Sequence, residues 1–214
     1  MRSALAAPLP GGAAQESMAP AWRGAALAAR GEAAVWKPAS VLVLLFPGDE
    51  RPESGGMPDV RFPLVERSSL VGFHRGEIAL PGGSREADET ALDAALREAR
   101  EELRLDAATA ARIEVLGRLS ALRVPPSGFE MSPFVAALDR RPPLAAAMPE
   151  IEDVIETRLD ILLAPGAASR EERELEGRLW NVPYYLIDGR KVWGATAMVL
   201  AELAAVLLLS GIAI

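Results

Sequence analysis

Residues 82–103 read GGSREADETALDAALREAREEL, a Gly-Gly pair followed by a segment rich in carboxylates. Apolar residues recur in this segment every three or four positions, at Leu92, Ala95, Ala99 and Leu103. That spacing predicts one amphipathic helix over residues 89–104, with Asp88 or Thr90 as its N-terminal cap. One face of the helix should therefore pack against a sheet while another presents acidic side chains.

The acidic side chains of this helix suggest a metal site. Glu98 and Glu102 are four residues apart and project from one face, with Glu101 beside them. Like charges at this spacing repel weakly, and a divalent cation reverses the sign of their interaction. Mg²⁺ prefers carboxylate and water oxygens, and adjacent glycines let backbone approach a ligand closely. We therefore expect Mg²⁺, with Mn²⁺ as an alternative, to be bound by Glu98, Glu101 and Glu102.

The helix taken alone also has a simpler interpretation. Arg97 and Glu101 are spaced to form an ion pair, as are Glu101 and Arg104. A solvent-exposed helix face crossed by ion pairs would have the same composition. At the level of the helix, both interpretations stay open.

The wider spacing resembles the sequence box of the Nudix family: Gly, five residues, Glu, seven residues, then Arg-Glu-aliphatic-x-Glu-Glu-x-Gly-aliphatic. The matching residues are Gly83, Glu89, Arg97, Glu98, Glu101, Glu102 and the final aliphatic Leu105. Six identities at fixed spacing arise by chance about once in a million frames. Two positions depart from the box: Ala99 is small for an aliphatic position, and Arg104 replaces the final Gly, from which we expect the helix to extend by a residue or two.

The resemblance implies an α/β fold, the Nudix-type α/β/α sandwich with a mixed sheet in a single domain. It implies Glu98 and Glu102 as principal Mg²⁺ ligands, with Glu101 as a further ligand or acting through water. Arg97 and Glu89 would orient these carboxylates. The general base would be Glu101 or a glutamate outside the helix, for which Glu150 and Glu152 are candidates; each of those two is equally compatible with an ordinary solvated loop.

The amino-acid composition limits which classes of molecule the protein is expected to bind. Half of the 214 residues are hydrophobic and a quarter are charged, which is ordinary for a globular domain. A net charge of −7 disfavours nucleic acid, and the absence of cysteine excludes disulfides and thiolate metal sites. We expect a small-molecule substrate, a cytoplasmic location, no nucleic-acid or membrane partner, and a homodimer as one possible assembly.

Periodicity and turn residues divide the rest of the chain into elements. Residues 1–35 are expected to be a loose tail or a short helix around 22–34, followed by one domain over 36–214. Residues 40–46 and 61–66 should form a hairpin with a long connection, and 166–177 a solvated loop. The apolar C-terminus, interrupted by Glu202, should be a packed helix from about Trp193. Further strands are expected at 77–80, 113–118, 132–138, 153–157 and 178–188, with a short helix or turn at 158–164.

The segment before the box resembles Nudix enzymes that act on coenzyme A. The matching residues are Leu64, Arg67, Ser68, His74, Gly76, Ile78, Pro81, Gly82 and Gly83, and KVWGATAMVL at 191–200 resembles the opening of that subgroup's last helix. The resemblance implies Arg67, His74, Arg75, Gly82 and Gly83 in substrate binding, since arginine suits phosphate. Gly72, Glu77 and Leu80 depart from the subgroup, which weakens the assignment of the substrate.

Three functions therefore compete. The first is Mg²⁺-dependent hydrolysis of coenzyme A or acyl-coenzyme A to a phosphopantetheine and adenosine 3′,5′-bisphosphate. The second is hydrolysis of ADP-ribose, NADH or another nucleoside diphosphate compound. The third is a catalytically silent Nudix-fold binding module, which the presence of Glu98, Glu101 and Glu102 disfavours.

Overall fold

A mixed β-sheet forms the centre of the computed structural model, which describes residues 1–50, 58–68, 76–147, 149–175 and 177–211. The strand order is β3-β2-β1-β7-β5, with β4 paired to β1, β6 to β7 and β8 to β2. β1 runs parallel to β7 and antiparallel to β2. The strands are β1 (Lys37–Pro47), β2 (Val60–Arg67), β3 (Ile78–Ala79), β4 (Gly82–Ser84), β5 (Glu114–Arg118), β6 (Leu122–Val124), β7 (Phe129–Ala137) and β8 (Ile151–Arg158).

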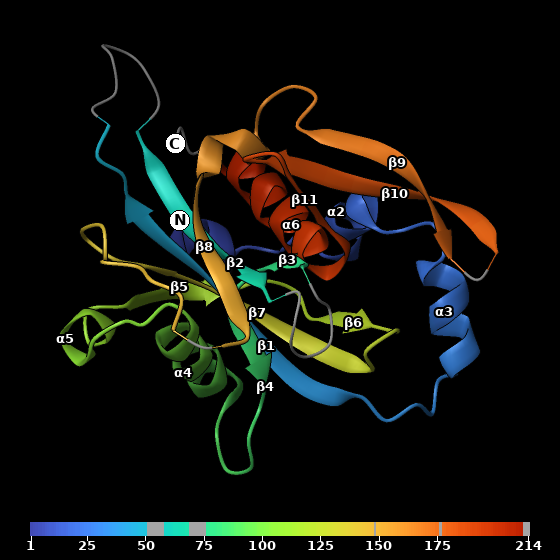
Figure 1. Ribbon diagram of the computed structural model, residues 1–214, viewed down its shortest axis with the longest axis horizontal. Coiled ribbons are helices and arrows are strands. Elements are labelled where there is room, and N and C mark those ends of the chain that lie inside the picture. The colour runs from blue at the N-terminus through green and yellow to red at the C-terminus, as the bar shows by residue number, and fades with distance from the viewer. Residues whose placement is uncertain (51–57, 69–75, 148, 176, 212–214) are drawn as a thin grey trace.

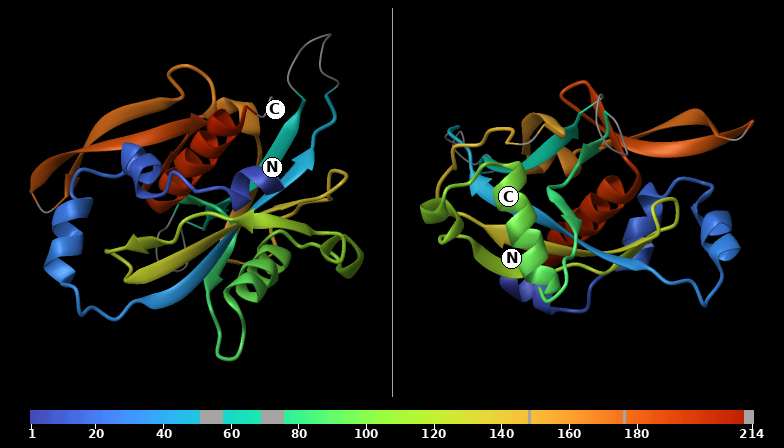
Figure 2. Two further views of the ribbon diagram at one scale, coloured as in Figure 1. Left: turned by 180° about the vertical axis from the view of Figure 1, so that it is seen from behind. Right: turned by 60° about the horizontal axis from the view of Figure 1, so that its bottom comes forward.

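Helices cover both faces of this sheet (Figures 1 and 2). β1 is buried on both sides, so its residues alternate between two cores. Leu42, Leu44 and Phe46 pack with α4 (Ala91–Glu102), whereas Val41, Val43 and Leu45 pack in the core that contains α6 (Gly194–Ser210). The predicted α/β/α sandwich with a mixed sheet is therefore confirmed.

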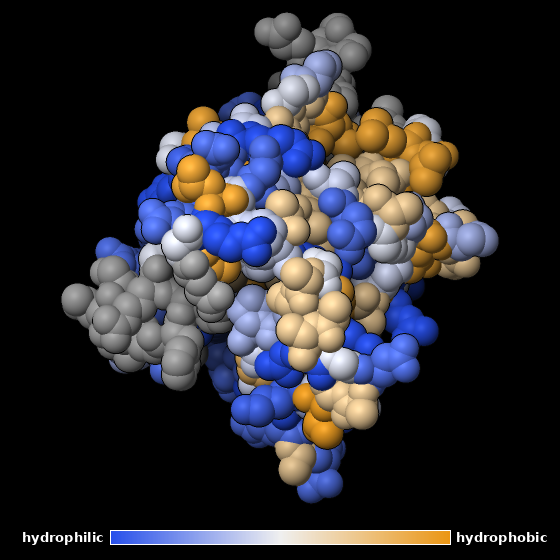
Figure 3. All heavy atoms as spheres, turned by 90° about the vertical axis from the view of Figure 1, so that its right-hand side faces the viewer, coloured by the Kyte–Doolittle hydropathy of each residue, from blue (hydrophilic) through white to orange (hydrophobic). Residues whose placement is uncertain are grey.

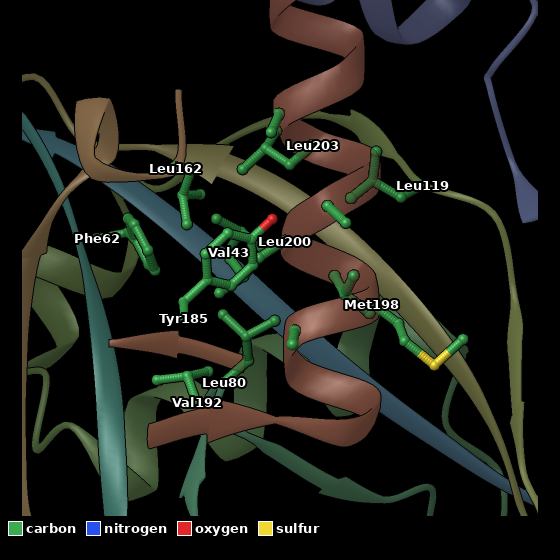
Figure 4. Close-up of a cluster of buried hydrophobic side chains, with 14 of the residues drawn as sticks. Val43, Phe62, Leu80, Leu119, Leu162, Tyr185, Val192, Met198, Leu200 and Leu203 are labelled. Carbon is green, nitrogen blue, oxygen red and sulfur yellow. The ribbon is translucent and has the colours of Figure 1, made fainter. Parts of the chain in front are cut away.

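The larger core lies between the sheet and α6, as Figure 4 shows. Leu200 and Leu203 of α6 face Phe62 and Val43 of the sheet, and Tyr185 lies between them. Each of these five residues is at most 6 % exposed. The apolar C-terminal segment is therefore a core helix, as predicted, and across the described ranges no helix is long and apolar enough to cross a lipid bilayer.

A second, three-stranded sheet comes from a segment that we expected to contain a loop. β9 (Ala168–Leu175) pairs antiparallel with β10 (Arg178–Ile187), which pairs with β11 (Arg190–Trp193). The prediction of a solvated loop over 166–177 was wrong, because charged residues on both faces of an exposed ribbon hide the alternation that marks a strand. The hairpin turn at Asp188-Gly189 has positive φ at both residues, 47° and 76°, as a tight two-residue turn requires.

The remaining predictions of secondary structure were mostly correct. β5, β7, β8 and the 3₁₀ turn η2 (Leu159–Leu162) lie where strands and a turn were expected. The hairpin of β1 and β2 is present, and it pairs only near its closed end, at Phe46–Arg61 and Pro47–Val60. Outside the N-terminal segment, four short described elements were not predicted: β4, β6, β11 and α5 (Ala107–Ala110). Each has at most four residues, too few to display a period.

The N-terminal residues are folded against the domain. They form α1 (Arg2–Ala6), α2 (Gly12–Gln15), η1 (Glu16–Met18) and α3 (Arg23–Arg30). α3 confirms the short helix expected around residues 22–34, but the expectation of a loose tail was wrong. Leu5 and Met18 are 7 % and 2 % exposed and belong to the core on the α6 side. Single apolar residues separated by glycine and proline gave no periodic signal for this packing.

A buried carboxylate ties this N-terminal segment to α6. Glu202 is completely buried, and it accepts hydrogen bonds from the backbone N–H groups of Gly11 (3.2 Å) and Ser120 (3.2 Å) and from Nε2 of Gln15 (2.8 Å). Glu202, the acid that interrupts the apolar C-terminal run, therefore joins α6 to the N-terminal segment and to the chain at Ser120. A buried polar group is tolerated where its hydrogen bonds are satisfied in this way.

The surface mixes hydrophilic side chains with smaller hydrophobic groups on the face drawn in Figure 3. Large exposed hydrophobic residues are spread over several elements: Val35, Leu175, Leu179, Leu186, Leu208 and Leu209. Isolated residues of this kind are normal on monomers. The homodimer stays a prediction.

Helix α4 ends differently from what we expected. Arg104, at the position of the box glycine, has φ of 55° in the left-handed region, and the helix stops at Glu102. The backbone N–H groups of Leu105 and Arg104 donate to the carbonyls of Arg100 (3.0 Å) and Glu101 (3.4 Å), the two bonds of a Schellman cap. The expected extension of the helix was wrong, because the cap forces the turn even without glycine.

Replacement of Glu202 by alanine should destabilise the protein by about 3 kcal/mol, because three buried N–H donors lose their acceptor. Urea unfolding followed by circular dichroism measures this change. Gln15→Ala removes a single donor and should cost about 1 kcal/mol. Equal stabilities of the wild type and Glu202→Ala would contradict the role of this carboxylate.

Replacement of Arg104 by glycine should stabilise the protein by about 1 kcal/mol, since an L-residue in the left-handed region costs about that much and glycine does not. The expected rise in Tm is about 2–4 °C for a chain of this size, measured by differential scanning calorimetry. Arg104→Ala is the matched control, because alanine keeps the Cβ and should give no gain. A Tm no higher for the glycine variant than for the alanine variant would rule out backbone strain at this position.

Candidate functional site

Helix α4 places its carboxylates with a well-defined N-terminus. Thr90 accepts a hydrogen bond from the backbone N–H of Asp93 (3.2 Å), and the carboxylate of Asp93 reaches back to the backbone N–H of Thr90 (3.3 Å). This reciprocal capping box fixes where the helix starts. Ala95, Ala99 and Leu103 face the sheet with no exposed surface, so the rotation of the helix is fixed as well.

Arg97 organises the acidic face of the helix. Its guanidinium donates to both carboxylate oxygens of Glu89, at 3.0 and 3.2 Å, and its Nη1 donates to Glu98 (2.9 Å) and Glu101 (3.2 Å). Its Nη2 also donates to the carbonyl oxygen of Ser84 (3.2 Å) in β4. The bonds from Arg97 hold the pKa of the Glu89 carboxyl below its ordinary value. One arginine therefore fixes three glutamates of the box and the strand beside them.

Glu102 lies deeper than the other two helix glutamates. It is 5 % exposed, and one of its oxygens accepts a hydrogen bond from the backbone N–H of Gly82 (2.9 Å). The pKa of the Glu102 carboxyl is raised to about 7, chiefly by burial. The charges of Glu98 and Glu150 add to this rise, whereas the Gly82 hydrogen bond and the charge of Arg67 oppose it. Glu98 also has a raised pKa because of its burial, an effect that its bond to Arg97 opposes. Two neighbouring carboxylates are thus both costly to ionise.

Only glycine fits at the two positions before the helix, because a side chain at either position would clash with neighbouring atoms. A Cβ on Gly83 would lie 2.5 Å from Oε1 of Glu98, and a Cβ on Gly82 would lie 2.3 Å from the carbonyl oxygen of Ser40. Gly82 also has φ of 154°, which side chains rarely adopt. The glycine pair therefore lets the helix carboxylates touch the backbone of β4.

Most of the predicted site residues come together in the structure. Glu98, Glu101, Glu102 and Arg97 share one helix face, and Gly82 and Gly83 lie against it. Arg67 at the end of β2 and the exposed Glu150 lie within electrostatic reach of Glu102, and the Ser68 backbone N–H donates to the Glu150 carbonyl (2.7 Å). His74 and Arg75, like Gly72, lie outside the described residues. The roles of all these residues in catalysis or binding stay predictions.

The chemistry of the donor set fits a divalent cation. Glu102 is buried and Glu98 is half-buried, the pKa of each is raised above its ordinary value, and Glu101 lies beside them, so a cation would offset an unfavourable concentration of charge. Within the described part of the chain, however, no three acidic or histidine side chains converge as a ready-made ligand set. The reason is visible in the contacts, because Arg97 holds Glu98 and Glu101 towards itself. Binding of a cation through Oε1 of Glu98 would compete with the bond from Arg97.

Sequence reasoning missed a charged cavity next to this site. A cavity of about 450 Å³ is lined by β2 and β3 on one side and by β9 and β11 on the other, including Glu66, Glu77, Arg173, Arg190, Lys191 and Trp193. Arg190 pairs with Glu66 (2.8 Å), and Arg173 lies 4.3 Å from the centre of the Trp193 ring. Glu66 precedes Arg67, so the end of β2 contributes to both places. No pattern in the sequence marks this cavity, because the charged residues of β9 show no apolar alternation.

The fold and the site together define a class of α/β/α proteins in which a carboxylate-rich helix packs against a Gly-Gly strand. Comparison with known proteins identifies the family. The sequence model of the NUDIX domain matches residues 36–175, well over half of the chain. The protein therefore belongs to the Nudix hydrolase family, whose enzymes are pyrophosphohydrolases and generally use a divalent metal.

Individual relatives agree with this assignment. The chain is 32 % identical over 177 residues to Nudix hydrolase 15, mitochondrial, of Arabidopsis thaliana, covering 79 % of this chain and 58 % of that protein. It is 28 % identical over 148 residues to the uncharacterized Nudix hydrolase NudL of Yersinia pestis, covering 69 % and 72 %. A MutT/nudix family protein from Enterococcus faecalis shares the fold, with a TM-score of 0.51, 17 % identity and coverage of 92 % and 77 %.

The buried carboxylate of Glu102 predicts that the metal-free protein loses stability as the pH rises. The pKa is raised from 4.5 to about 7 on folding, so its stabilising contribution is complete below 4.5 and is lost as the pH passes through 7. The loss should be about 3 kcal/mol between pH 5 and 8, measured by urea unfolding in the presence of EDTA. Glu102→Gln cannot titrate and should remove most of this slope. A wild-type slope no steeper than that of the variant would contradict the raised pKa.

Proposed function

We propose that this protein hydrolyses the diphosphate linkage of a nucleoside diphosphate derivative in a reaction that depends on a divalent cation, Mg²⁺ or Mn²⁺. The observation that carries the proposal is the position of the half-buried Glu98 and the buried Glu102, two carboxylates with raised pKa values against the glycine pair of β4. A site serving only ion pairs on the surface would have no reason to bury them.

Each box residue takes a role that fits its contacts. Glu98 and Glu102 are the principal cation ligands, and Glu101, which is 41 % exposed, is a further ligand or acts through a bound water. A bound divalent cation would neutralise diphosphate oxygens and lower the pKa of a coordinated water. Arg97 and Glu89 order the acidic face of the helix before a cation binds, through the bonds described above.

The chemical step needs a base and an anchor for the phosphates. A water attacks phosphorus, the bridging P–O bond breaks, and the proton of the water passes to a carboxylate. Glu150 suits this role because it is exposed and acts electrostatically on Glu102 from outside the helix; Glu101 is the alternative. Arg67 is positively charged and acts electrostatically on Glu102. Its guanidinium suits a contact with a phosphate oxygen.

Coenzyme A or an acyl-coenzyme A is our proposed substrate, with a phosphopantetheine and adenosine 3′,5′-bisphosphate as products. Support comes from the sequence resemblance at Leu64, Arg67 and Ser68, from Trp193-Gly194 at the start of α6, and from the cavity beside β3. The cavity combines an aromatic ring with Arg173, Arg190 and Lys191, a composition that can accept the base and phosphate groups of a nucleotide. ADP-ribose, NADH and other nucleoside diphosphate compounds are the alternatives.

A panel of substrates tests the proposal. With Mg²⁺ present, the purified protein should cleave coenzyme A or its acyl esters faster than ADP-ribose or NADH, with the products identified by mass spectrometry. A faster reaction with ADP-ribose or NADH would replace the proposed substrate but keep the proposed chemistry. No cleavage of any compound in the panel, with Mg²⁺ or Mn²⁺, would favour a silent binding module.

Neutralising the helix carboxylates should abolish the reaction. Glu98→Gln and Glu102→Gln should each lower kcat/KM by about 100-fold or more, because stabilisation of charge in the transition state is lost. Glu114→Gln, which changes an exposed glutamate on β5, is the matched control and should keep wild-type activity. Wild-type rates for both helix variants on the best substrate would show that neither carboxylate binds the cation.

A further inference from the structure

One buried side chain next to the carboxylates has no apparent structural purpose. Ser40 of β1 is completely buried, and among the described residues no atom is a hydrogen-bond partner for its Oγ. The neighbouring inward positions on this face of the strand, Leu42, Leu44 and Phe46, are all apolar. An alanine would fit the same space without leaving a hydroxyl unsatisfied, so the hydroxyl needs an explanation.

Strand geometry places this hydroxyl beside Glu98. Side chains alternate along β1, so Ser40 lies on the face of Leu42 and Leu44, the face covered by α4. Ser40 is the direct antiparallel partner of Gly83 in β4. Directly opposed Cβ positions in such a pair lie about 4.5–5.5 Å apart on the same face. The Cβ position of Gly83 is 2.5 Å from Oε1 of Glu98, so the carboxylate of Glu98 is the cross-strand neighbour of Ser40.

In the structure, this carboxylate is turned towards Arg97. Oε1 of Glu98 accepts a hydrogen bond from Nη1 of Arg97 at 2.9 Å, and the same nitrogen also donates a hydrogen bond to Glu101. Glu98 cannot direct this same oxygen, Oε1, to a cation and keep the bond to Arg97 unchanged. When it turns away, it loses a donor in a half-buried place, and the Ser40 hydroxyl on the adjoining strand is a donor placed to replace it.

We propose that Ser40 is a positioning residue: its hydroxyl donates a hydrogen bond to Glu98 when Glu98 turns from Arg97 to a divalent cation. The inference rests on the proposed function, because it takes Glu98 as a cation ligand. It assigns Ser40 no contact with substrate. The unpaired hydroxyl beside Glu98 and the bond that turns Glu98 towards Arg97 then have one explanation.

The chain offers a matched control. Thr157 of β8 is the second buried residue with an unpaired hydroxyl, and it is 3 % exposed. Its antiparallel partner is Phe62, which belongs to the core on the opposite, α6-facing side of the sheet. Ser40→Ala and Thr157→Val therefore both remove a buried unpaired hydroxyl, but only Ser40→Ala removes one beside Glu98.

Binding of Mn²⁺ alone, followed by electron paramagnetic resonance of the free ion, tests the proposal without turnover. Ser40→Ala should raise the Kd for Mn²⁺ about 10-fold, the range seen when a residue that orients a metal ligand is removed, whereas Thr157→Val should leave it unchanged. Without metal, both variants should unfold at the wild-type Tm or above. Activity of Ser40→Ala, lost at low Mg²⁺, should return at saturating Mg²⁺.

The outcomes separate this inference from the proposed function. If wild-type protein binds Mn²⁺, Glu98→Gln weakens that binding and Ser40→Ala does not, the role of Ser40 is wrong and the metal site stands. Equal weakening by Ser40→Ala and Thr157→Val would also overturn it, because the effect would then be general to buried hydroxyls. Absence of Mn²⁺ binding by the wild type would overturn the metal site and the role of Ser40 together.

Discussion

The close approach of α4 to the sheet determines where every candidate functional group lies. Ala94, Ala95 and Ala99 have no exposed surface, and such small side chains allow the helix axis to come near the strands. At this separation, glutamates on the flank of the helix reach the backbone of β4 instead of solvent. Glu98 fills the space that a side chain on Gly83 would occupy, and Glu102 accepts the backbone N–H of Gly82. A helix with larger residues at the alanine positions would stand further away, and the same carboxylates would be ordinary surface charges.

The rest of the fold holds this arrangement from the other side of the sheet. β1 contributes alternate residues to both cores, so displacement of one layer disturbs the other. α6 fills the opposite face, and its single acid, Glu202, joins that helix to the N-terminal segment and to Ser120. The N-terminal residues thus complete the core on the side away from the carboxylates. Stability and the candidate site therefore use different faces of one strand, which is why the polar hydroxyl of Ser40 is unusual on its face.

The parts of the structure that could be predicted from the sequence are those that depend on the periodicity of apolar residues or on motif residues at fixed spacing. The buried strand β1, the carboxylate helix and the Nudix box follow from patterns that persist over many residues. The β9 ribbon did not, because it is exposed on both faces and its charges show no alternation of burial. The packing of the N-terminus depends on two isolated residues, Leu5 and Met18, whose partners lie far away in the sequence. The end of α4 was mispredicted because the hydrogen bonds of the cap outweigh the preference of Arg104 against a positive φ.

Arg97 orders the acidic side chains of the candidate site and would also compete with a cation for them. Its single guanidinium serves Glu89, Glu98 and Glu101, so it offsets much of the repulsion that three neighbouring acids would otherwise produce. The same bonds oppose binding of a cation, since Glu98 and Glu101 cannot serve Arg97 and a metal equally well. Glu102 is different, because its bond is to a backbone N–H that does not compete for the charge of the carboxylate. Under the proposed function, Glu102 is therefore free of Arg97 while Glu98 and Glu101 share it, and any group that stabilises Glu98 turned away from Arg97 would add to the affinity for a cation.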